Sequence, residues 1–362
     1  MEDTYYMRRA IALARMGAGF VNPNPMVGAV IVKNDRIIGE GYHEVYGGLH
    51  AERQALKHCS ESAEGATLYV TLEPCCHYGK TPPCTEAIIE NKIAKVVIGT
   101  LDVNPLVAGK GAEILRDNGI KVNVGVLENE CRKLNKVFNK YISTKRPFVL
   151  MKYAMTADGK IATITGESRW ITGEDSRQRV HNYRNDLSGI MVGVETVIKD
   201  DPMLNCRRQT PSKDPLRIVC DTRLRTPVSS KLVQTARDIP TVIATCEDDK
   251  EKVAEYEKNG VKIIQVSKTQ KGIDLYELMT KLGEMNIDSV LLEGGGTLNF
   301  SALESQIVDE IDVFIAPKIL GGKAKSPVEG AGIEKISEAI KLTPVGISQI
   351  GEDFLIENEV SY

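Results

Sequence analysis

The chain has 362 residues, of which 42% are hydrophobic and 26% are charged, a balance typical of globular proteins. At roughly 150 residues per domain, this length predicts two domains, each large enough for its own core. The formal net charge of −3 provides no basic face for nucleic acid, so we expect a small-molecule substrate and no nucleic-acid partner.

The N-terminal segment MEDTYYMRRAIALARMGAGF lacks the pattern of a signal peptide, because arginines interrupt its apolar stretch and acidic residues stand in the place of a basic start. No run of the chain approaches the roughly 18 apolar residues of a membrane-spanning helix. We therefore expect a cytoplasmic protein with no membrane partner.

The first part of the chain predicts alternating strands and helices. Residues 3–17 have the apolar spacing of a helix, and residues 28–42 predict a hairpin with Asn34-Asp35 at its turn. A helix is expected to begin near His50. The elements that follow are a strand at 67–72, a helix at 85–91, a strand at 95–99, a helix at 112–118, a strand at 122–125 and a polar helical stretch at 128–142. This alternation predicts an α/β sandwich.

The segment STKRPF, residues 143–148, is typical of a linker and divides the chain into domains 1–145 and 146–362. In the second domain, strands are expected at 148–155, 189–194, 216–221, 241–245, 262–266, 289–293 and 310–316, with a helix at 301–305. This pattern predicts a mainly parallel sheet with crossover helices.

Metal-binding residue types are concentrated in the first domain. His50-Ala51-Glu52 is followed by a strand that ends at Pro74-Cys75, and Cys84 opens the next helix. One imidazole and two thiolates suit a catalytic zinc ion, which takes three protein ligands and leaves a position for water. Glu52 lies too close to His50 to be a comfortable second ligand, and it would move protons between water and substrate. The combination is typical of zinc-dependent deaminases that act on a heterocyclic base.

The spacing departs from the usual pattern of these deaminases, because eight residues rather than two separate Cys75 from Cys84. The longer loop leaves Cys76 and His77 as rival ligands, although Cys75 is preferred because it follows the strand and Pro74. A structural zinc site or buried cysteines without metal are the alternatives, but a structural site would use four ligands and leave Glu52 without a role.

Four polar residues near this motif are candidate contacts to the substrate of the deaminase: Asn24, His43, His77 and Lys80. A loop that carries His77 and Lys80 suits a phosphate-bearing substrate. Each of them taken alone could equally be a solvated surface residue.

The second domain contains signals for a phosphorylated cofactor. The segment EGGGTLN, residues 293–299, follows an apolar strand and precedes a helix, where bare backbone amides can bind phosphate. A simple glycine turn is the alternative. Arg223 and Arg225 follow another strand and could pair with a second phosphate, so the set favours NADPH over NADH.

Together these segments resemble a known family. The motifs HAE, TLEPCCHYGKTPPC, NPNPMVGAVIV, KYAMTADGKIA and VGVETVIKDDPMLNCR, spread over essentially the whole chain, are similar to those of the bifunctional riboflavin-biosynthesis deaminase–reductases. The resemblance implies an α/β fold, in which a cytidine-deaminase-like α/β/α sandwich precedes a dihydrofolate-reductase-like α/β domain. It also implies one zinc ion per chain, NADPH as the second cofactor and a homo-oligomer.

The resemblance further implies a reaction sequence. A diaminopyrimidinone with a ribosylamino phosphate would first lose its ring amine by hydrolysis, and NADPH would then reduce the ribosyl group to ribityl. His50, Cys75 and Cys84 would hold zinc, and Glu52 would carry protons.

Two groups of residues in the second domain are implied by the same resemblance. Those implied to contact NADPH are Ala154, Trp170, Thr196, Asp200, Thr222, Gly295, Gly296, Thr297, Leu298, Asn299, Phe300 and Ser301. Those implied to contact the substrate of the reductase are Ser168, Arg184, Leu204, Arg207 and Glu293.

Three other functions remain open at this level: a nucleic-acid-editing deaminase, a mononucleotide deaminase with a regulatory domain, and a zinc-stabilised scaffold that binds nucleotides. The lack of a basic, aromatic-rich stretch argues against the first. Turnover of NADPH would exclude the second, and loss of turnover in Glu52→Gln with zinc retained would exclude the third.

Overall fold

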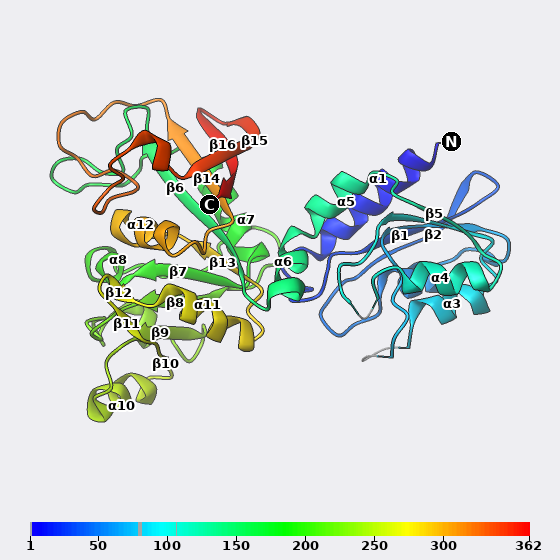
Figure 1. The fold of residues 1–362 in the computed structure, drawn as a ribbon, viewed down its shortest axis with the longest axis horizontal. Helices are drawn as coiled ribbons and strands as arrows, with labels where there is room; N and C mark the ends of the chain where they lie inside the picture. The colour runs from blue at the N-terminus through cyan, green and yellow to red at the C-terminus, as the bar shows by residue number, and fades with distance from the viewer. Residues whose placement is uncertain (1, 79–81, 106) are drawn as a thin grey trace. The chain divides into compact units, whose positions relative to one another are not determined.

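The structure is a computed structural model that describes residues 2–78, 82–105 and 107–362 (Figure 1). The chain forms two compact units, Met1–Lys145 and Arg146–Tyr362. Of the residues described, none belongs to a helix long and apolar enough to cross a membrane.

The first unit is built on a five-stranded sheet of order β2-β1-β3-β4-β5. Its strands are β1 (Gly28–Lys33), β2 (Arg36–Tyr42), β3 (Thr67–Leu72), β4 (Lys95–Thr100) and β5 (Lys121–Val124). Its helices are α1 (Asp3–Ala14), α2 (Ala51–Lys57), α3 (Cys84–Glu90), α4 (Lys110–Asp117), α5 (Glu128–Leu134) and α6 (Lys136–Thr144). β1 is antiparallel to β2 and β3, whereas β3, β4 and β5 run parallel.

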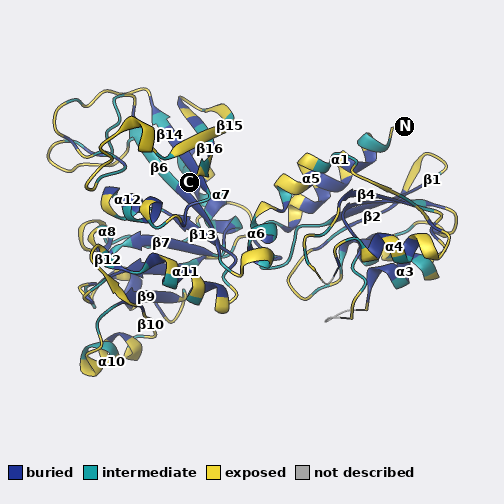
Figure 2. Cartoon of the chain, viewed as in Figure 1, coloured by how far each residue is buried: buried dark blue, intermediate teal, exposed yellow. Residues whose placement is uncertain are grey.

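Helices cover both faces of this sheet, because successive side chains of a strand point to opposite sides. Val30 packs with Met7 of α1 on one face. Its neighbour Ile31 packs on the other face with Ala55 of α2 and Ile88 of α3. Buried side chains therefore line both faces of the sheet, and the polar residues of the helices lie outside (Figure 2). The prediction of an α/β/α sandwich is confirmed.

The second unit contains a nine-stranded sheet of order β10-β9-β8-β7-β13-β6-β14-β16-β15. Its strands are β6 (Phe148–Thr156), β7 (Gly189–Gly193), β8 (Leu216–Cys220), β9 (Thr241–Thr245), β10 (Lys262–Gln265), β13 (Ser289–Leu292), β14 (Glu310–Ala316), β15 (Lys341–Ile350) and β16 (Asp353–Ser361). A separate small ribbon joins β11 (Lys268–Thr269) to β12 (Gly272–Ile273). The helices are α7 (Glu174–Asp186), α8 (Val194–Asp200), α9 (Lys231–Gln234), α10 (Lys250–Lys258), α11 (Leu275–Glu284) and α12 (Gly296–Glu304).

The strands from β10 to β14 in this order are parallel, as the sequence predicts, but β16 and β15 add an antiparallel hairpin that was not expected. β15 escaped sequence reasoning because it is exposed along most of its length and contains Pro344, which is unusual inside a strand.

The expected helix at 301–305 is too short at its N-terminal end. α12 begins at Gly296, with Gly295 as its extended N-cap. Glycine is a poor helix former, so the run of glycines in the sequence predicts a loop. In the structure, Gly296 packs closely in the first turn of α12. A Cβ atom at this position would lie 2.7 Å from the Glu329 side chain. The glycine segment thus forms the N-terminus of a helix.

Candidate active sites

Three ligand-type side chains converge at the ends of elements in the first unit. His50 is the N-cap of α2, Cys75 follows β3, and Cys84 is the first residue of α3. Arg53 connects α2 to the segment that leads into α3. Its guanidinium donates hydrogen bonds to the Pro82 carbonyl at 3.2 Å and to the Pro83 carbonyl at 2.8 Å.

The geometry of this cluster fits zinc. The Sγ atoms of Cys75 and Cys84 each lie 3.4 Å from His50 Nδ1, and the three ligand atoms lie within 4.8 Å of one another. Within residues 2–78, 82–105 and 107–362, this is the one such group of three, and it does not include Cys76. A set of one imidazole and two thiols leaves a fourth position of a tetrahedral site for water.

The two thiols of the cluster differ in pKa. Hydrogen bonding from Cys84 and His50 lowers the pKa of Cys75 to about 4. The pKa of Cys84 is raised, because its thiol donates to Cys75 and is buried. The lowered pKa of Cys75 favours its thiolate, which is the form that binds metal.

Glu52 lies beside the cluster in the first turn of α2 and is only 3% exposed. Burial raises the pKa of its carboxyl group. Its side chain lines a cavity of about 340 Å³, together with His50 and Cys75. Two of the ligand residues and a candidate proton carrier thus face one cavity.

Three of the four expected substrate contacts line the same cavity: Asn24, His43 and His77. The buried His43 has Nδ1 3.0 Å from the Leu49 carbonyl, so Nδ1 carries the proton and Nε2 accepts from the Asn24 amide at 3.2 Å. Burial lowers the pKa of His43 and keeps it neutral. Lys80 lies outside the described residues.

Sequence reasoning missed three polar residues of this cavity: Glu73, Asp102 and Asn104. Burial raises the pKa of Asp102 to about 6. Glu73 accepts hydrogen bonds from the backbone amides of Asp102, Gly109 and Ala112, at 3.2, 2.9 and 3.0 Å, and so holds the loop after β4. The sequence signal that could have identified these residues is the polar segment that follows β4. Because β4 is parallel to β3, the two strands end at the same edge of the sheet.

In the second unit, a cavity of about 870 Å³ collects all the residues expected to contact the substrate of the reductase. They are Ser168, Arg184, Leu204, Arg207 and Glu293. Ala154, Trp170 and Asp200, expected to contact NADPH, also line this cavity.

A partly buried ion pair lies within this group. Arg184 Nε and Nη2 donate to the two carboxylate oxygens of Glu293 at 3.1 and 3.0 Å. Burial would raise the pKa of Glu293, but Arg184 and Lys152 outweigh it and lower the pKa to about 2. Glu293 is therefore ionised, and Arg184 is oriented by it, while Arg207 is exposed and more open to a phosphate.

His181 of α7 also lines the cavity and was not expected. Burial and the nearby Arg184 and Arg207 lower its pKa to about 4, so its ring is neutral. The polar sequence of α7 conceals it, because helical periodicity alone does not show which face meets a cavity.

A second cleft, of about 490 Å³, shares Ser168, Asp200 and Glu293 with the first. It is lined by most of the remaining residues expected to contact NADPH, namely Thr196, Thr222, Gly295, Gly296, Thr297, Leu298 and Ser301. Asn299 and Phe300 do not line it: both are buried, and Asn299 donates to the Pro327 carbonyl at 2.8 Å. They lie on the side of α12 that packs against the protein.

Comparison with known proteins agrees with this two-site arrangement. The model described as "Cytidine and deoxycytidylate deaminase zinc-binding region" matches residues 1–100, and that of the "RibD C-terminal domain" matches residues 147–356. The chain is 58% identical to riboflavin biosynthesis protein RibD of Actinobacillus pleuropneumoniae, over 99% of this chain and 95% of that protein. It is 39% identical to the RibD protein of Escherichia coli, over 98% of each chain.

Among solved structures, the deaminase/reductase of Thermotoga maritima is 40% identical and superposes with a TM-score of 0.89 over 99% of each chain. The chain belongs to the RibD family of bifunctional riboflavin-biosynthesis enzymes, which combine a zinc-binding deaminase domain with an NADPH-using reductase domain.

Proposed function

We propose that residues 1–145 deaminate a diaminopyrimidinone that carries a ribosylamino phosphate, and that residues 146–362 then reduce its ribosyl group to ribityl. The similar Thermotoga maritima protein is a diaminohydroxyphosphoribosylaminopyrimidine deaminase and 5-amino-6-(5-phosphoribosylamino)uracil reductase, which supports this class of substrate. The observation that carries the proposal is the cluster of His50, Cys75 and Cys84 at the cavity that also contains Glu52.

In the deaminase, His50 Nδ1 and the two Sγ atoms would hold zinc. Bound zinc supplies Lewis-acid activation of water. The Glu52 carboxylate would accept one proton of the attacking water and pass it to the ring nitrogen, and would then carry the proton of the remaining hydroxyl to the amine, which leaves as ammonia. Its burial keeps bulk water away from this transfer.

Substrate recognition in the deaminase would come from Asn24, His43, His77 and Lys80. The hydrogen bond between Asn24 and His43 orients the Asn24 amide, so its carbonyl oxygen is free to accept from an amine of the base. His77 and Lys80 would face the phosphate, because both lie in the loop between Cys75 and Cys84.

In the reductase, the cleft of about 490 Å³ would hold NADPH through the residues named above that line it, and NADPH supplies the hydride. The larger cavity would hold the substrate, with Ser168 and Leu204 positioning it and Arg207 binding its phosphate. The ion pair of Arg184 with Glu293 would form the part of the cavity wall that the sugar contacts.

We further propose that the protein acts as a cytoplasmic homo-oligomer with no nucleic-acid or membrane partner. The net charge of −3 and the family resemblance support this proposal. Sedimentation of the purified protein would test the oligomer.

The test of function is to incubate zinc-loaded protein with the diaminopyrimidinone substrate, with and without NADPH, while ammonia and NADPH absorbance are followed. We expect stoichiometric ammonia without NADPH, and loss of NADPH only after deamination. Ammonia without oxidation would reduce the second unit to a binding module, and absence of ammonia would overturn the substrate assignment.

The matched variant is Glu52→Gln, which preserves the shape of the side chain but cannot take up the proton. We expect ammonia release to fall by roughly 10²- to 10⁴-fold while zinc content stays unchanged. Unchanged turnover would contradict the role of Glu52.

A further inference from the structure

Helix α6 lines the deaminase cavity, although it lies outside residues 1–100, which match the deaminase family model. Phe138, Tyr141 and Ile142 of this helix contribute to the wall of the cavity of about 340 Å³. Residues three and four positions apart share one face of a helix, so the three side chains form a continuous strip. Part of the deaminase site is therefore supplied by the last helix of the first unit.

The strip that α6 supplies is apolar and aromatic. Phe138 and Tyr141 are both buried, so the surrounding protein holds their rings in place. The same cavity contains the polar side chains of His50 and Glu52 from the metal site. A planar heterocycle has two apolar faces and a polar edge, and a cavity with an aromatic wall beside polar groups matches both. The strip thus suits the ring of a substrate rather than its charged phosphate.

The start of α6 is joined to the loop that carries Asn24. Asn135 is the N-cap residue of α6 and is only 2% exposed. Its Oδ1 accepts a hydrogen bond from the Met26 amide at 2.8 Å, and its Nδ2 donates to the Met26 carbonyl at 3.0 Å. The Asn135 carbonyl accepts from the Asn139 amide at 2.8 Å in the first turn of α6. One buried residue therefore connects the helix to the loop.

The loop of residues 22–27 reaches the cavity directly. The residues of this loop that line the cavity are Pro23, Asn24, Pro25 and Val27. The Asn24 amide lies 3.2 Å from His43 Nε2, and the Val27 carbonyl accepts from the His43 amide at 2.9 Å. Met26 stands between Asn24 and Val27, so its two hydrogen bonds with Asn135 set the position of the loop relative to α6.

We propose that α6 is part of the deaminase active site, where Phe138 and Tyr141 pack against the pyrimidine ring. Asn135 is then a positioning residue, which fixes this aromatic wall relative to Asn24. The inference rests on the proposed deamination and adds the residues that select for the ring. The zinc ligands and Glu52 lie on α2, after β3 and on α3, so changes in α6 should alter substrate binding more than the chemical step.

The test uses full-length, zinc-loaded protein and measures KM and kcat for ammonia release from the diaminopyrimidinone substrate. Phe138→Leu keeps an apolar side chain but removes the aromatic ring, and we expect KM to rise roughly three- to tenfold. Asn135→Ala leaves the Met26 amide and carbonyl without their partner, and we expect KM to rise roughly tenfold. In both variants kcat should stay within about threefold of the wild-type value, with zinc content unchanged.

Inhibition of ammonia release by ribose 5-phosphate separates the ring from the phosphate, because this probe has the sugar phosphate but no ring. We expect its inhibition constant to change by less than about twofold in Phe138→Leu. An equal loss for the probe and for the substrate would overturn the assignment of the wall to the ring.

The matched control is Asn139→Ala, which removes an asparagine side chain one turn further along α6 that is not among the residues lining the cavity. Its KM should equal that of the wild type. Unchanged KM in Phe138→Leu would overturn the role of the wall, and unchanged KM in Asn135→Ala would overturn the positioning role. Loss of zinc with KM unchanged would do the same, because it would assign these residues to stability alone. If the wild-type protein released no ammonia, the proposed deamination would fail, and this inference with it.

Discussion

The metal cluster of the first unit and the cavities of the second unit are built in different ways. His50, Cys75 and Cys84 come from 35 consecutive positions and sit at the ends of α2, β3 and α3. The reductase cavity draws its residues from Lys152 to Glu293, across several strands and helices. A site that sits within one supersecondary unit can be recognised from spacing, whereas a site assembled across a sheet depends on strand order.

The largest effect is expected from a substitution that removes a zinc ligand of the first site and leaves the second site intact. Cys84→Ser should lose zinc and reduce ammonia release to the background rate, because two remaining ligands do not hold the ion. Metal analysis and ammonia assays would measure both, and NADPH affinity should be unchanged. Cys76→Ser is the matched control: if it also lost zinc, Cys76 would have to be counted among the ligands.

A smaller effect is expected from the pair of Arg184 with Glu293 in the second site. Glu293→Gln leaves the partly buried Arg184 without its charged hydrogen-bond acceptor, which costs about 2 kcal/mol. We expect lower thermal stability of the second unit and a reductase kcat/KM reduced roughly a hundredfold, with ammonia release retained. A variant of wild-type stability and activity would show that the pair has no such role.

The support of the metal cluster should matter less than the ligands themselves. Arg53→Met removes the hydrogen bonds to the Pro82 and Pro83 carbonyls, which hold the segment entering α3. We expect zinc to be lost to a chelator roughly tenfold faster. Arg36→Met, which breaks only the exposed pair with Glu61, is the control and should retain zinc normally.

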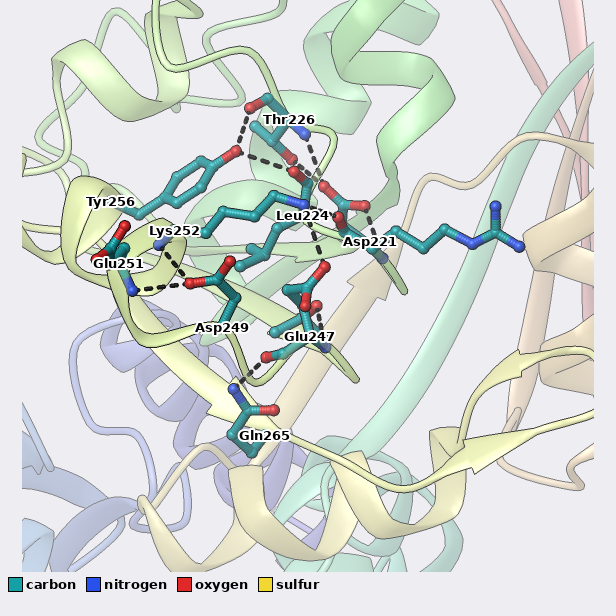
Figure 3. Close-up of polar contacts among 11 residues, drawn as sticks. Asp221, Leu224, Thr226, Glu247, Asp249, Glu251, Lys252, Tyr256 and Gln265 are labelled. Atoms are coloured by element: carbon teal, nitrogen blue, oxygen red, sulfur yellow. Dashed lines mark hydrogen bonds and ion pairs between the residues drawn. The ribbon is translucent and has the colours of Figure 1, made fainter.

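The smallest effect concerns a hollow of about 340 Å³ that adjoins the cofactor cleft and is lined by Arg223, Arg225 and Lys268, where the extra phosphate of NADPH would lie. A buried hydrogen-bond network around Asp221 holds the turn that carries the two arginines (Figure 3). Glu195→Gln releases Arg225 from its exposed ion pair and leaves the fold unchanged. We expect NADPH to bind up to about threefold more tightly, with NADH unaffected. Titration of both nucleotides would measure it, and weaker binding of NADPH would show that Glu195 assists the cofactor.

Much of the fold could be predicted because hydrophobic periodicity marks strands directly. The strands expected at 67–72, 241–245 and 310–316 have the same bounds in the structure. The hairpin of β15 and β16 could not be predicted in the same way, since β15 buries almost none of its side chains. Its existence depends on pairing with β16, which pairs in turn with β14.

The site residues also fall into two groups, those that local spacing predicts and those that depend on tertiary contacts. The spacing of His50, Glu52, Cys75 and Cys84 was sufficient to predict the cluster, because each residue stands at the junction of a strand or helix with a loop. Glu73 and Asp102 were missed, because their importance comes from hydrogen bonds to a loop after a neighbouring strand. The segment that contains Asn299 and Phe300 lines the cleft, but these two side chains are buried on the other side of α12, since helical rotation decides which side faces the cleft.

By itself, the sequence determined the two α/β units, the zinc-type ligand set and the glycine segment at a helix start, since each depends on short-range spacing and local backbone preference. Only the tertiary structure decided that Arg184 meets Glu293, 109 positions away, and that Arg223 and Lys268 line one hollow. Such pairs depend on the order of strands in the sheet and on side-chain direction. Neither is encoded in local spacing, because both follow from how the whole core packs.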